Sequence, residues 1–381
     1  MIYFDNSATT RPYEEVLDAF ITVNREFFGN PSSLHNFGGK AEKLITKARE
    51  QISGLLGVRP TEIYFTSGGT EANNLAIKGL ALEHQGRGNH IIATSVEHAS
   101  VREACRQLES LGFTTTYLPV GKDGAVSVED IRAAITEETI LVAVMHVNNE
   151  VGAVQPVQDI AQLLKSYPKI HFHVDHVQGA GKLPLDLSVI DTASFSAHKF
   201  HGLKGTGFLY VRDGIRLFPL FGGGNQERRV RSGTENTGGI VSMAKAFRLI
   251  EEERIAKGGR LREIRNNIIS GLSKMENVHV HTPEKHAAPH IINFSVPGLK
   301  GEVLVHALEQ EGIIVSTTSA CSSKDKSASG TLIAMGVSEE EARSAIRASL
   351  SYQNTMNEAK EFLEKLDKVI RKLFSVVGRE L

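Results

Sequence analysis

The segment Thr139-Ile140-Leu141-Val142-Ala143-Val144-Met145-His146-Val147 decides the fold. Its apolar run is continuous rather than alternating, so it predicts a strand that is buried on both faces of a sheet. A helical pattern at Val157–Tyr167 comes next, followed by a second short strand at His171–Asp175. A strand, a helix and a strand in this order predict two parallel neighbours joined by a crossover helix.

The same alternation extends outward from this segment in both directions. It predicts an α/β fold with a large, mostly parallel sheet that helices cover on both faces. The further strands are predicted at Ile63–Thr66, His90–Thr94, Thr114–Val120 and Gly207–Val211, and the further helices at Glu71–His84, Ala99–Leu111 and Val128–Ile135.

The pattern changes after Gly238, where longer helical segments and short strands predict a smaller α+β domain. We expect an N-terminal segment (1–15) that joins the small domain, a large domain (16–255) and a small domain (256–381) with a polar loop at 317–331. The helices are predicted at Ser242–Ala256, Arg260–Met275, Glu302–Gln310, Ser338–Ala345 and Asn357–Phe374, and the strands at Val278–His281, His290–Val296 and Ile313–Ser316.

Composition narrows the class of protein. The chain has 381 residues, a formal net charge of −1, 41% hydrophobic and 23% charged residues. This balance excludes a disordered chain and argues against a dedicated nucleic-acid binder. No run approaches the ~20 apolar residues of a spanning helix, no signal peptide is apparent, and two cysteines cannot form a disulfide framework. We expect a cytoplasmic enzyme without direct membrane or nucleic-acid contacts.

Ligands of parallel sheets bind at the carboxyl ends of the strands, so candidate chemistry is sought there. Ser67-Gly68-Gly69-Thr70 lies between a predicted strand and a predicted helix. Its glycines allow close backbone approach, and the helix N-terminus offers N–H groups to an anion. A phosphate site and a plain helix cap both fit this segment.

The segment His171-Phe172-His173-Val174-Asp175-His176 has two readings. It is similar to the metal motif of the metallo-β-lactamase superfamily, and imidazole and carboxylate are good zinc ligands. The motif here ends a strand in the middle of an α/β alternation, however, and that superfamily's later ligands have no counterpart. Ordinary strand histidines, with Asp175 at the strand end, are the simpler interpretation.

Ser194-Phe195-Ser196-Ala197-His198-Lys199 is the most informative segment. A lysine in a confined site can form a Schiff base, and Asp175 lies at a strand end upstream. Pyridoxal 5′-phosphate (PLP) needs both groups, a lysine for its aldehyde and a carboxylate for its ring nitrogen.

These residues belong to an ordered series that covers nearly the whole chain. The series resembles the class V aminotransferase family and, within it, the cysteine desulfurases of the NifS/IscS type. The motifs that carry the resemblance are Tyr3–Thr10, Gly29–His35, Thr66–Asn74, Glu97-His98, His146–Gly152, Asp175–Gly181, Ser194–Lys199, Gly222–Gly224, Arg231–Thr234 and Ser319-Ala320-Cys321.

The resemblance implies a fold type I PLP-dependent transferase with a sheet of the seven-stranded type, and a role for each matched residue. Lys199 would carry the PLP, and Asp175 and Gln178 would bind its ring nitrogen and its hydroxyl. His98 would stack on the ring and assist proton transfer, while Asn149 and Arg347 would meet the substrate carboxylate or a cofactor oxygen. The alternative for Arg347 is an ordinary surface residue of the segment Ala345–Ser351. The residues that would hold the phosphate are Gly69, Thr70, Ser196, His198 and, from the other subunit of a homodimer, Thr234.

The two cysteines have different surroundings. Cys105 lies on a predicted helix with Val101 and Leu108 at helical spacing, which predicts a buried structural side chain. Cys321 lies in a polar stretch with Lys324 and Lys326 nearby, which favours the thiolate. The resemblance implies that Cys321 is the nucleophile that takes sulfur from L-cysteine as a persulfide.

The implied activity is conversion of L-cysteine to L-alanine, with sulfur passing from Cys321 to an acceptor protein. That acceptor would be an iron–sulfur scaffold or a tRNA-thiolation enzyme, with Cys321 as the point of transfer and no resident metal. Relatives often read Leu-Glu-Pro-Ser-His after the cysteine, but this chain has Lys326-Ser327-Ala328-Ser329-Gly330, which leaves the acceptor open. Selenocysteine lyase, another class V aminotransferase, a metal hydrolase and a non-catalytic scaffold are the alternatives.

Overall fold

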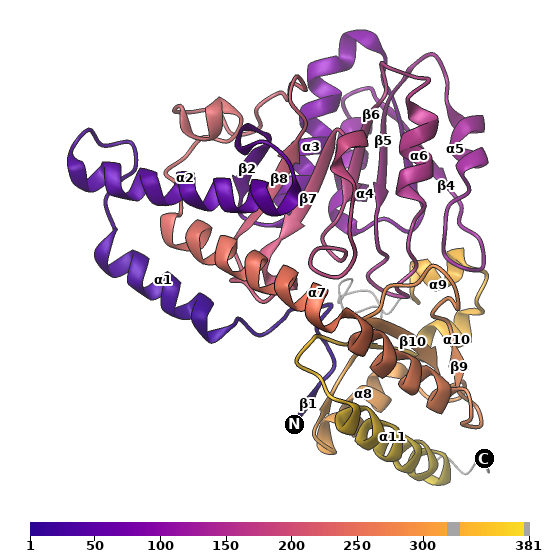
Figure 1. Ribbon diagram of the computed structural model, residues 1–381. Coiled ribbons are helices and arrows are strands. Elements are labelled where there is room, and N and C mark those ends of the chain that lie inside the picture. Colours follow the sequence, from indigo (N-terminus) through magenta and orange to yellow (C-terminus); the bar gives the residue numbers. More distant parts are fainter. Residues whose placement is uncertain (318–327, 377–381) are drawn as a thin grey trace.

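The computed structural model describes residues 1–317 and 328–376. A seven-stranded sheet with helices on both faces forms the larger part, and a four-stranded sheet with its own helices forms the smaller part (Figure 1). The predicted α/β class, with a large, mostly parallel sheet and a smaller α+β part, is confirmed.

The large sheet has the strand order β2-β8-β7-β6-β5-β3-β4. All neighbours are parallel except β8, which runs antiparallel to both β2 and β7. The strands are β2 (Ile63–Thr66), β3 (His90–Thr94), β4 (Thr114–Leu118), β5 (Thr139–Met145), β6 (His171–Asp175), β7 (Thr192–Ser196) and β8 (Gly207–Val211).

Strand β5 shows why its apolar run is continuous. Leu141 and Ala143 belong to one apolar cluster, whereas Val142 and Val144 belong to another. Successive side chains of a strand point to opposite faces, so both faces of β5 are covered. The covering helices are α3 (Gly69–His84) and α4 (Ala99–Glu109) on the first face, and α5 (Val128–Ala134), α6 (Val157–Leu164) and α7 (Thr237–Leu272) on the second.

The small sheet is antiparallel, in the order β12-β13-β10-β9. A separate parallel pair joins the N-terminal segment to this part of the chain, because Ile2 pairs with Ile313 and Tyr3 with Ile314. The elements are β1 (Ile2–Tyr3), β9 (His279–Val280), β10 (Ile291–Ser295), α8 (Gly301–Gln310), β11 (Ile313–Ile314), β12 (Ser316–Thr317), α9 (Gly330–Ala334), α10 (Glu339–Arg343), β13 (Ala345–Ser349) and α11 (Met356–Val376).

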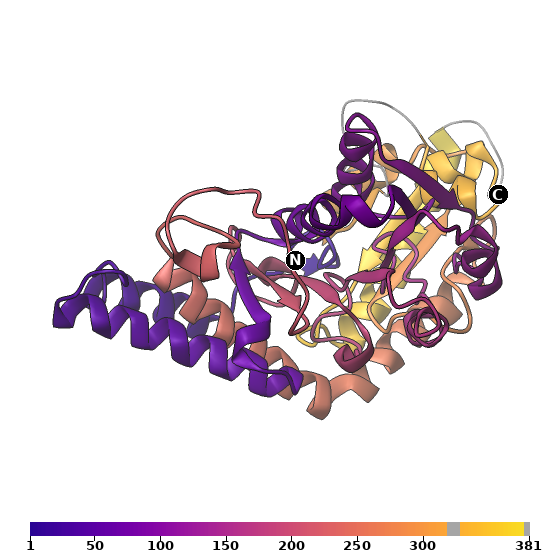
Figure 2. The ribbon, with the colours of Figure 1, turned by 90° about the horizontal axis from the view of Figure 1, so that it is seen from above.

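Two N-terminal helices, α1 (Glu14–Glu26) and α2 (Asn36–Leu56), pack along α7 on the side away from the C-terminal elements (Figures 1 and 2). Short 3-10 turns complete the described elements. These turns are η1 (Pro60–Glu62), η2 (Gln85–Arg87), η3 (Leu187–Val189), η4 (Ala197–Lys199) and η5 (Gln226–Arg229). None of the helices in the described residues is long and apolar enough to cross a membrane.

Two sequence predictions about the C-terminal part are wrong. The segments Ser242–Ala256 and Arg260–Met275 are not separate helices but parts of α7, which continues through Gly258 and Gly259. Glycine weakens a helix by ~0.5–1 kcal/mol per residue. The helix survives because buried side chains anchor it on both sides of the glycines, among them Ile250 and Leu261. The predicted domain boundary at 255–256 therefore falls inside one helix.

The second error concerns the segment after α10. A helix was predicted over Ser338–Ala345, but it ends at Arg343, and Ala345 begins the strand β13. Every residue of β13 is buried, and the strand is an inner strand of the sheet, between β12 and β10. This strand places Arg347 inside the protein and overturns the surface alternative for that residue.

Candidate functional site

A cavity of about 490 Å³ lies at the carboxyl ends of the large-sheet strands. Asp175 and Ser196 end β6 and β7, Gly69 begins α3, and Arg347 comes from the small sheet. The two sheets therefore share the walls of the cavity. The predicted site residues that line it are Gly69, Thr70, His98, Asn149, Asp175, Gln178, Ser196, His198, Lys199 and Arg347.

Lys199 lines the cavity and is held by the N-terminal segment. Its ammonium group donates to the backbone carbonyls of Ser7 and, at 2.8 Å, Ala8. The side-chain amide of Gln178 also donates to the Ser7 carbonyl, at 3.0 Å. The backbone carbonyl of Ser7 thus helps to orient both Lys199 and Gln178, two candidate cofactor ligands. The sequence did not predict this role of the N-terminal segment.

Asp175 is buried and its two carboxylate oxygens accept different donors. Oδ1 accepts from the backbone N–H of Val177 at 2.9 Å, and Oδ2 accepts from Nδ2 of Asn73 at 2.8 Å. Nδ2 of Asn73 also donates to Ser100 Oγ at 2.8 Å, and its Oδ1 lies 3.0 Å from Nε2 of His173. Asn73 thus fixes the carboxylate through a network of buried polar groups.

Asn73 was not predicted as a site residue. It lies one helical turn after Gly69 on α3, so it shares that helix's face toward the sheet. This spacing within the Thr66–Asn74 motif was the signal that could have found it.

The start of α3 forms a narrow cradle for an anion. A Cβ atom at Gly69 would lie 2.7 Å from Val177 Cγ2 and 3.4 Å from Ser196 Cβ, so a side chain there would displace its neighbours. Gly68 has φ +147, a conformation that favours glycine. The cradle combines the free N–H groups of a helix N-terminus with the hydroxyls of Thr70 and Ser196, a donor set suited to phosphate.

Two histidines at the cavity have lowered pKa values. Burial lowers the pKa of His98, and the charge of Lys199 adds to this effect, while Asp175 opposes it. His98 caps α4, because its Nδ1 atom accepts from the backbone N–H of Ser100 at 3.1 Å; the same atom lies 2.8 Å from Ser100 Oγ. Burial, together with the charges of Lys199 and Lys204, lowers the pKa of His198 to about 4. Both shifts favour the neutral form of the ring.

Arg347 is only 4% exposed and is fixed at two points. Its Nη1 donates to the backbone carbonyl of Asn149 at 3.0 Å, and its Nη2 forms a 3.0 Å ion pair with Asp5. These contacts hold a guanidinium group at the wall of the cavity, beside Asn149.

The histidines of the metal-like motif have separate partners. His173 lies between Thr192 and Asn73, at 2.9 and 3.0 Å, and His176 pairs with His146 at 2.8 Å. Across residues 1–317 and 328–376, no group of three His, Cys, Asp or Glu side chains is placed to hold a metal ion. The geometry does not favour the metal-hydrolase alternative.

The prediction of a buried Cys105 is confirmed. Its side chain is fully buried among Val101, Leu108 and other apolar residues, and burial raises the pKa of its thiol to about 12. Such a thiol is not a nucleophile at neutral pH. Cys321 lies outside the described residues.

Thr234 does not line the cavity. It is exposed and borders a neighbouring hollow of about 240 Å³, which shares Ser67 and Gly205 with the cavity. Arg231, three residues earlier, forms a 2.7 Å ion pair with Glu71 on α3 and so ties this segment to the anion cradle.

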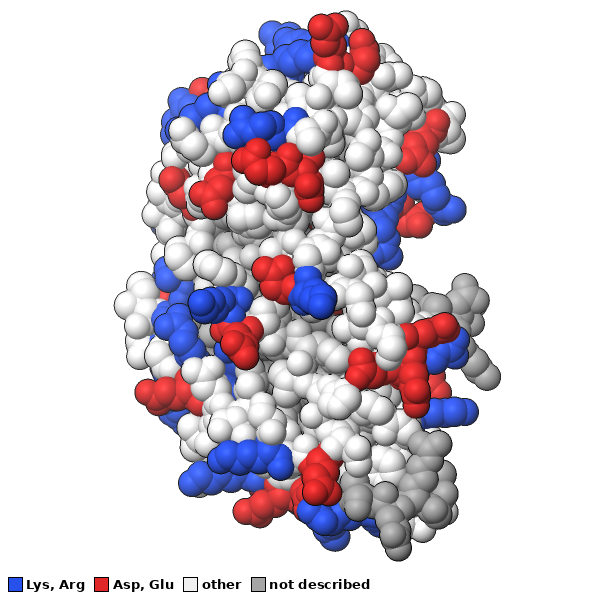
Figure 3. Space-filling view, turned by 90° about the vertical axis from the view of Figure 1, so that its right-hand side faces the viewer, with Lys and Arg blue, Asp and Glu red and all other residues white. Residues whose placement is uncertain are grey.

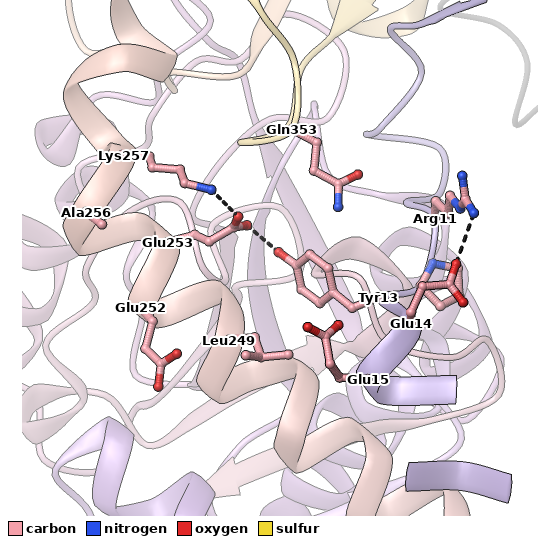
Figure 4. A pocket seen from close by; sticks show the side chains of 11 residues that line it. Arg11, Tyr13, Glu14, Glu15, Leu249, Glu252, Glu253, Ala256, Lys257 and Gln353 are labelled. Carbon is pink, nitrogen blue, oxygen red and sulfur yellow. Dashed lines mark hydrogen bonds and ion pairs between the residues drawn. The ribbon is translucent and has the colours of Figure 1, made fainter. Parts of the chain in front are cut away.

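A third hollow, of about 600 Å³, lies between α1 and α7 (Figure 4). The hydroxyl of Tyr13 donates to Glu253, which also accepts from Lys257 at 2.7 Å. Among residues 1–317 and 328–376, none of the predicted site residues lines this hollow, so its volume is no argument that it is the site.

The comparisons with known proteins agree with this geometry. A family model described as "Aminotransferase class-V" matches residues 2–362. The chain belongs to the class-V aminotransferase family.

Several relatives match nearly the whole length of this family member. It is 48% identical over 373 residues to the "NifS/IcsS protein homolog" of Lactobacillus delbrueckii subsp. bulgaricus, covering 97% of both chains. It is 42% identical over 378 residues to "Cysteine desulfurase IscS" of Dictyoglomus turgidum, covering 98% of this chain and 96% of the relative. A solved "NIFS-LIKE PROTEIN" superposes with a TM-score of 0.91 at 40% identity, covering 97% of this chain and 99% of the other. The predicted family and its PLP dependence are confirmed.

The cavity of this member of the class-V aminotransferase family fits PLP on its own residues. It provides a lysine, a buried carboxylate and an anion cradle at a helix N-terminus, all lining one space. These are the groups that a pyridine ring, an aldehyde and a phosphate require.

Replacing Asn73 by alanine should weaken PLP binding about tenfold, because Asp175 loses one of the two donors that fix its carboxylate. His173 Nε2 would also be left unpaired, at a cost of ~1–3 kcal/mol in unfolding free energy. Equilibrium dialysis against PLP and thermal unfolding measure the two effects. Asn74→Ala is the matched control, since Asn74 bonds only the Thr70 carbonyl, at 2.9 Å, among the described contacts. Equal PLP affinity in both variants would contradict the role given to Asn73.

Proposed function

We propose that this protein is a cysteine desulfurase that converts L-cysteine to L-alanine and takes the sulfur onto Cys321. The observation that carries the proposal is the single cavity that holds Lys199, Asp175 and Arg347 together. The relative in Dictyoglomus turgidum that is named cysteine desulfurase supports it.

We assign the cofactor contacts as follows. Lys199 would bond the PLP aldehyde, Asp175 would hold a proton on the ring nitrogen, and Gln178 would bind the hydroxyl. His98 would lie against the ring and move a proton on the substrate side. Bound PLP supplies an electron-withdrawing ring that stabilises negative charge on the carbon atoms of the amino acid. The phosphate is held by Gly69, Thr70, Ser196 and His198.

The substrate contacts follow from charge. Arg347 and Asn149 lie side by side at the wall of the cavity, and a guanidinium group suits a carboxylate. We assign both residues to the carboxylate of L-cysteine. The Asp5 ion pair helps to fix the orientation of the arginine through its Nη2 atom.

The sulfur step balances without an external oxidant. The Cys321 thiolate attacks the substrate sulfur, an S–S bond forms, and the C–S bond breaks. The electron pair of the broken bond stays with carbon, which takes up a proton and leaves as alanine. The outer sulfur of the Cys321 persulfide, which came from L-cysteine, is then the atom that passes to the acceptor.

We propose a homodimer in which Thr234 completes the phosphate site of the other subunit. Thr234 is exposed beside the anion cradle, and several large apolar side chains are exposed as at interfaces, among them Leu34, Phe28 and Phe218. Sedimentation of the PLP-loaded protein tests this, and a fully active monomer would contradict it.

We further propose a cytoplasmic enzyme whose acceptor is a protein, either an iron–sulfur scaffold or a tRNA-thiolation enzyme. A direct contact with nucleic acid is not part of the proposal, since the net charge is −1 and basic and acidic side chains alternate over the face shown in Figure 3.

The activity is tested by incubating the PLP-loaded protein with L-cysteine and a reducing thiol. We expect alanine and sulfide in equal amounts, with no requirement for a 2-oxo acid. A requirement for a 2-oxo acid would indicate an aminotransferase instead. Turnover with L-selenocysteine but not L-cysteine would indicate a selenocysteine lyase.

A further inference from the structure

The turn between Val147 and Val154 forms part of the cavity wall and is held rigidly. The backbone N–H of Asn148 donates to the carbonyl of Ala153 at 2.9 Å, and that of Gly152 donates back to Asn148 at 3.0 Å. Oδ1 of Asn148 accepts from the N–H groups of Glu150 and Val151, at 2.9 and 3.0 Å. Asn149 lines the cavity, and Glu150 follows directly after it.

The carboxylate of Glu150 binds two hydroxyls from the small part of the chain. Oε2 accepts from Ser329 Oγ at 2.5 Å, and Oε1 accepts from Thr331 Oγ1 at 3.0 Å. Ser329 Oγ also accepts from the N–H of Leu332 at 3.1 Å, so it caps α9 as well. We call Glu150, Ser329 and Thr331 the Glu150 clasp.

Apolar packing supports the clasp from the same two sides. Val151 and Ala153 of the turn form one buried cluster with Leu332 and Met335. The start of α9 is therefore fixed against the cavity wall by apolar contacts and by the carboxylate.

The chain is also anchored at the cavity wall just before the segment that contains Cys321. Ser316 pairs with Arg347 across β12 and β13, and Arg347 donates to the carbonyl of Asn149. Before the segment that contains Cys321, Ser316 is thus tied to Arg347 and through it to Asn149. After that segment, Ser329 and Thr331 are tied to Glu150, the residue next to Asn149.

We propose that Glu150 is a positioning residue for the sulfur step. Its carboxylate fixes the chain where the Cys321 segment ends, so that attack on the substrate sulfur depends on the clasp while L-cysteine binding does not. The inference rests on the proposed function, because it takes Cys321 as the nucleophile.

The experiment separates the two steps in the PLP-loaded enzyme. An absorbance titration with L-cysteine measures binding at the cofactor, and a single-turnover assay of alanine measures the step that needs Cys321. In Glu150→Ala we expect the half-saturating L-cysteine concentration to stay within about twofold of wild type. Alanine formation should slow about ten- to a hundredfold, as expected for a reacting group misplaced by about 1 Å.

Two further variants keep the test decisive. Thr331→Val removes one clasp hydrogen bond with almost no change of shape, so it covers the case in which Glu150→Ala fails to fold. Ser338→Ala is the matched control, because Ser338 caps α10 through the N–H of Glu341 at 3.3 Å without touching Glu150. We expect Thr331→Val to slow alanine formation severalfold and Ser338→Ala to leave it unchanged.

Wild-type single-turnover rates in both Glu150→Ala and Thr331→Val would overturn the proposal. A rate that recovers at saturating L-cysteine would overturn it as well, since Glu150 would then act on the substrate site through Asn149. If wild type itself forms no alanine, the proposed function fails, and that failure is distinct from either result.

Discussion

Replacing Cys321 by alanine should reduce alanine and sulfide release from L-cysteine to background while the protein stays yellow with bound PLP. No thiolate would remain to take the substrate sulfur, whereas all the assigned PLP contacts would be intact. L-Cysteine should still change the absorption spectrum, because that change needs only Lys199 and PLP. The measurements are alanine by amino-acid analysis and the spectrum before and after addition of substrate.

Cys105→Ala is the control for this prediction. Cys105 is fully buried in the α3–α4 cluster, so its loss should lower the unfolding free energy by about 1 kcal/mol through the small cavity that it leaves. Its turnover should match wild type. If Cys321→Ala keeps substantial activity, or if Cys105→Ala alone abolishes it, the nucleophile is assigned wrongly.

Replacing Lys199 by alanine should lower turnover on the order of a thousandfold or more, as loss of a covalent catalyst does elsewhere. The variant should lose the absorption band of PLP bonded to lysine, although the cradle at α3 can still bind free PLP. The spectrum, single-turnover alanine and the PLP content after dialysis measure these effects.

Borohydride reduction of wild type provides the chemical check on Lys199. Within the described part of the chain, Lys204 is the other lysine that lines the cavity, but its side chain is exposed. Peptide mapping should place the pyridoxyl group on Lys199 alone. Finding it on Lys204 would show that the Schiff-base lysine had been misidentified.

The sequence predicted the large sheet well because its strands have strong local signals. The ranges His90–Thr94, His171–Asp175 and Gly207–Val211 match β3, β6 and β8. The site followed from the sheet, since parallel strands bring their carboxyl ends to one edge. Asp175 and Ser196 lie together for that reason, although 21 residues separate them in the sequence.

Other features depend on tertiary contacts that no local pattern encodes. Gly258-Gly259 predicts a helix break, but packing on both sides keeps α7 continuous. β13 was missed because its residues do not alternate in polarity, since both sides of the strand are buried. Lys199 is held by the backbone carbonyls of Ser7 and Ala8. Every residue has such a carbonyl, so the sequence does not indicate which ones will bind the lysine.

The tie between the N-terminal segment and the small sheet has a consequence for biosynthesis. Asn6 donates to the Ser349 carbonyl at 3.0 Å, a partner 343 residues later, and Asp5 pairs with Arg347. Contacts between residues so far apart in the sequence form late and slow folding. A ribosome makes these early residues first and their partners nearly last. We therefore expect truncated chains whose synthesis stops before Arg347 to lack a closed cavity and to retain no PLP, even if their central sheet has folded.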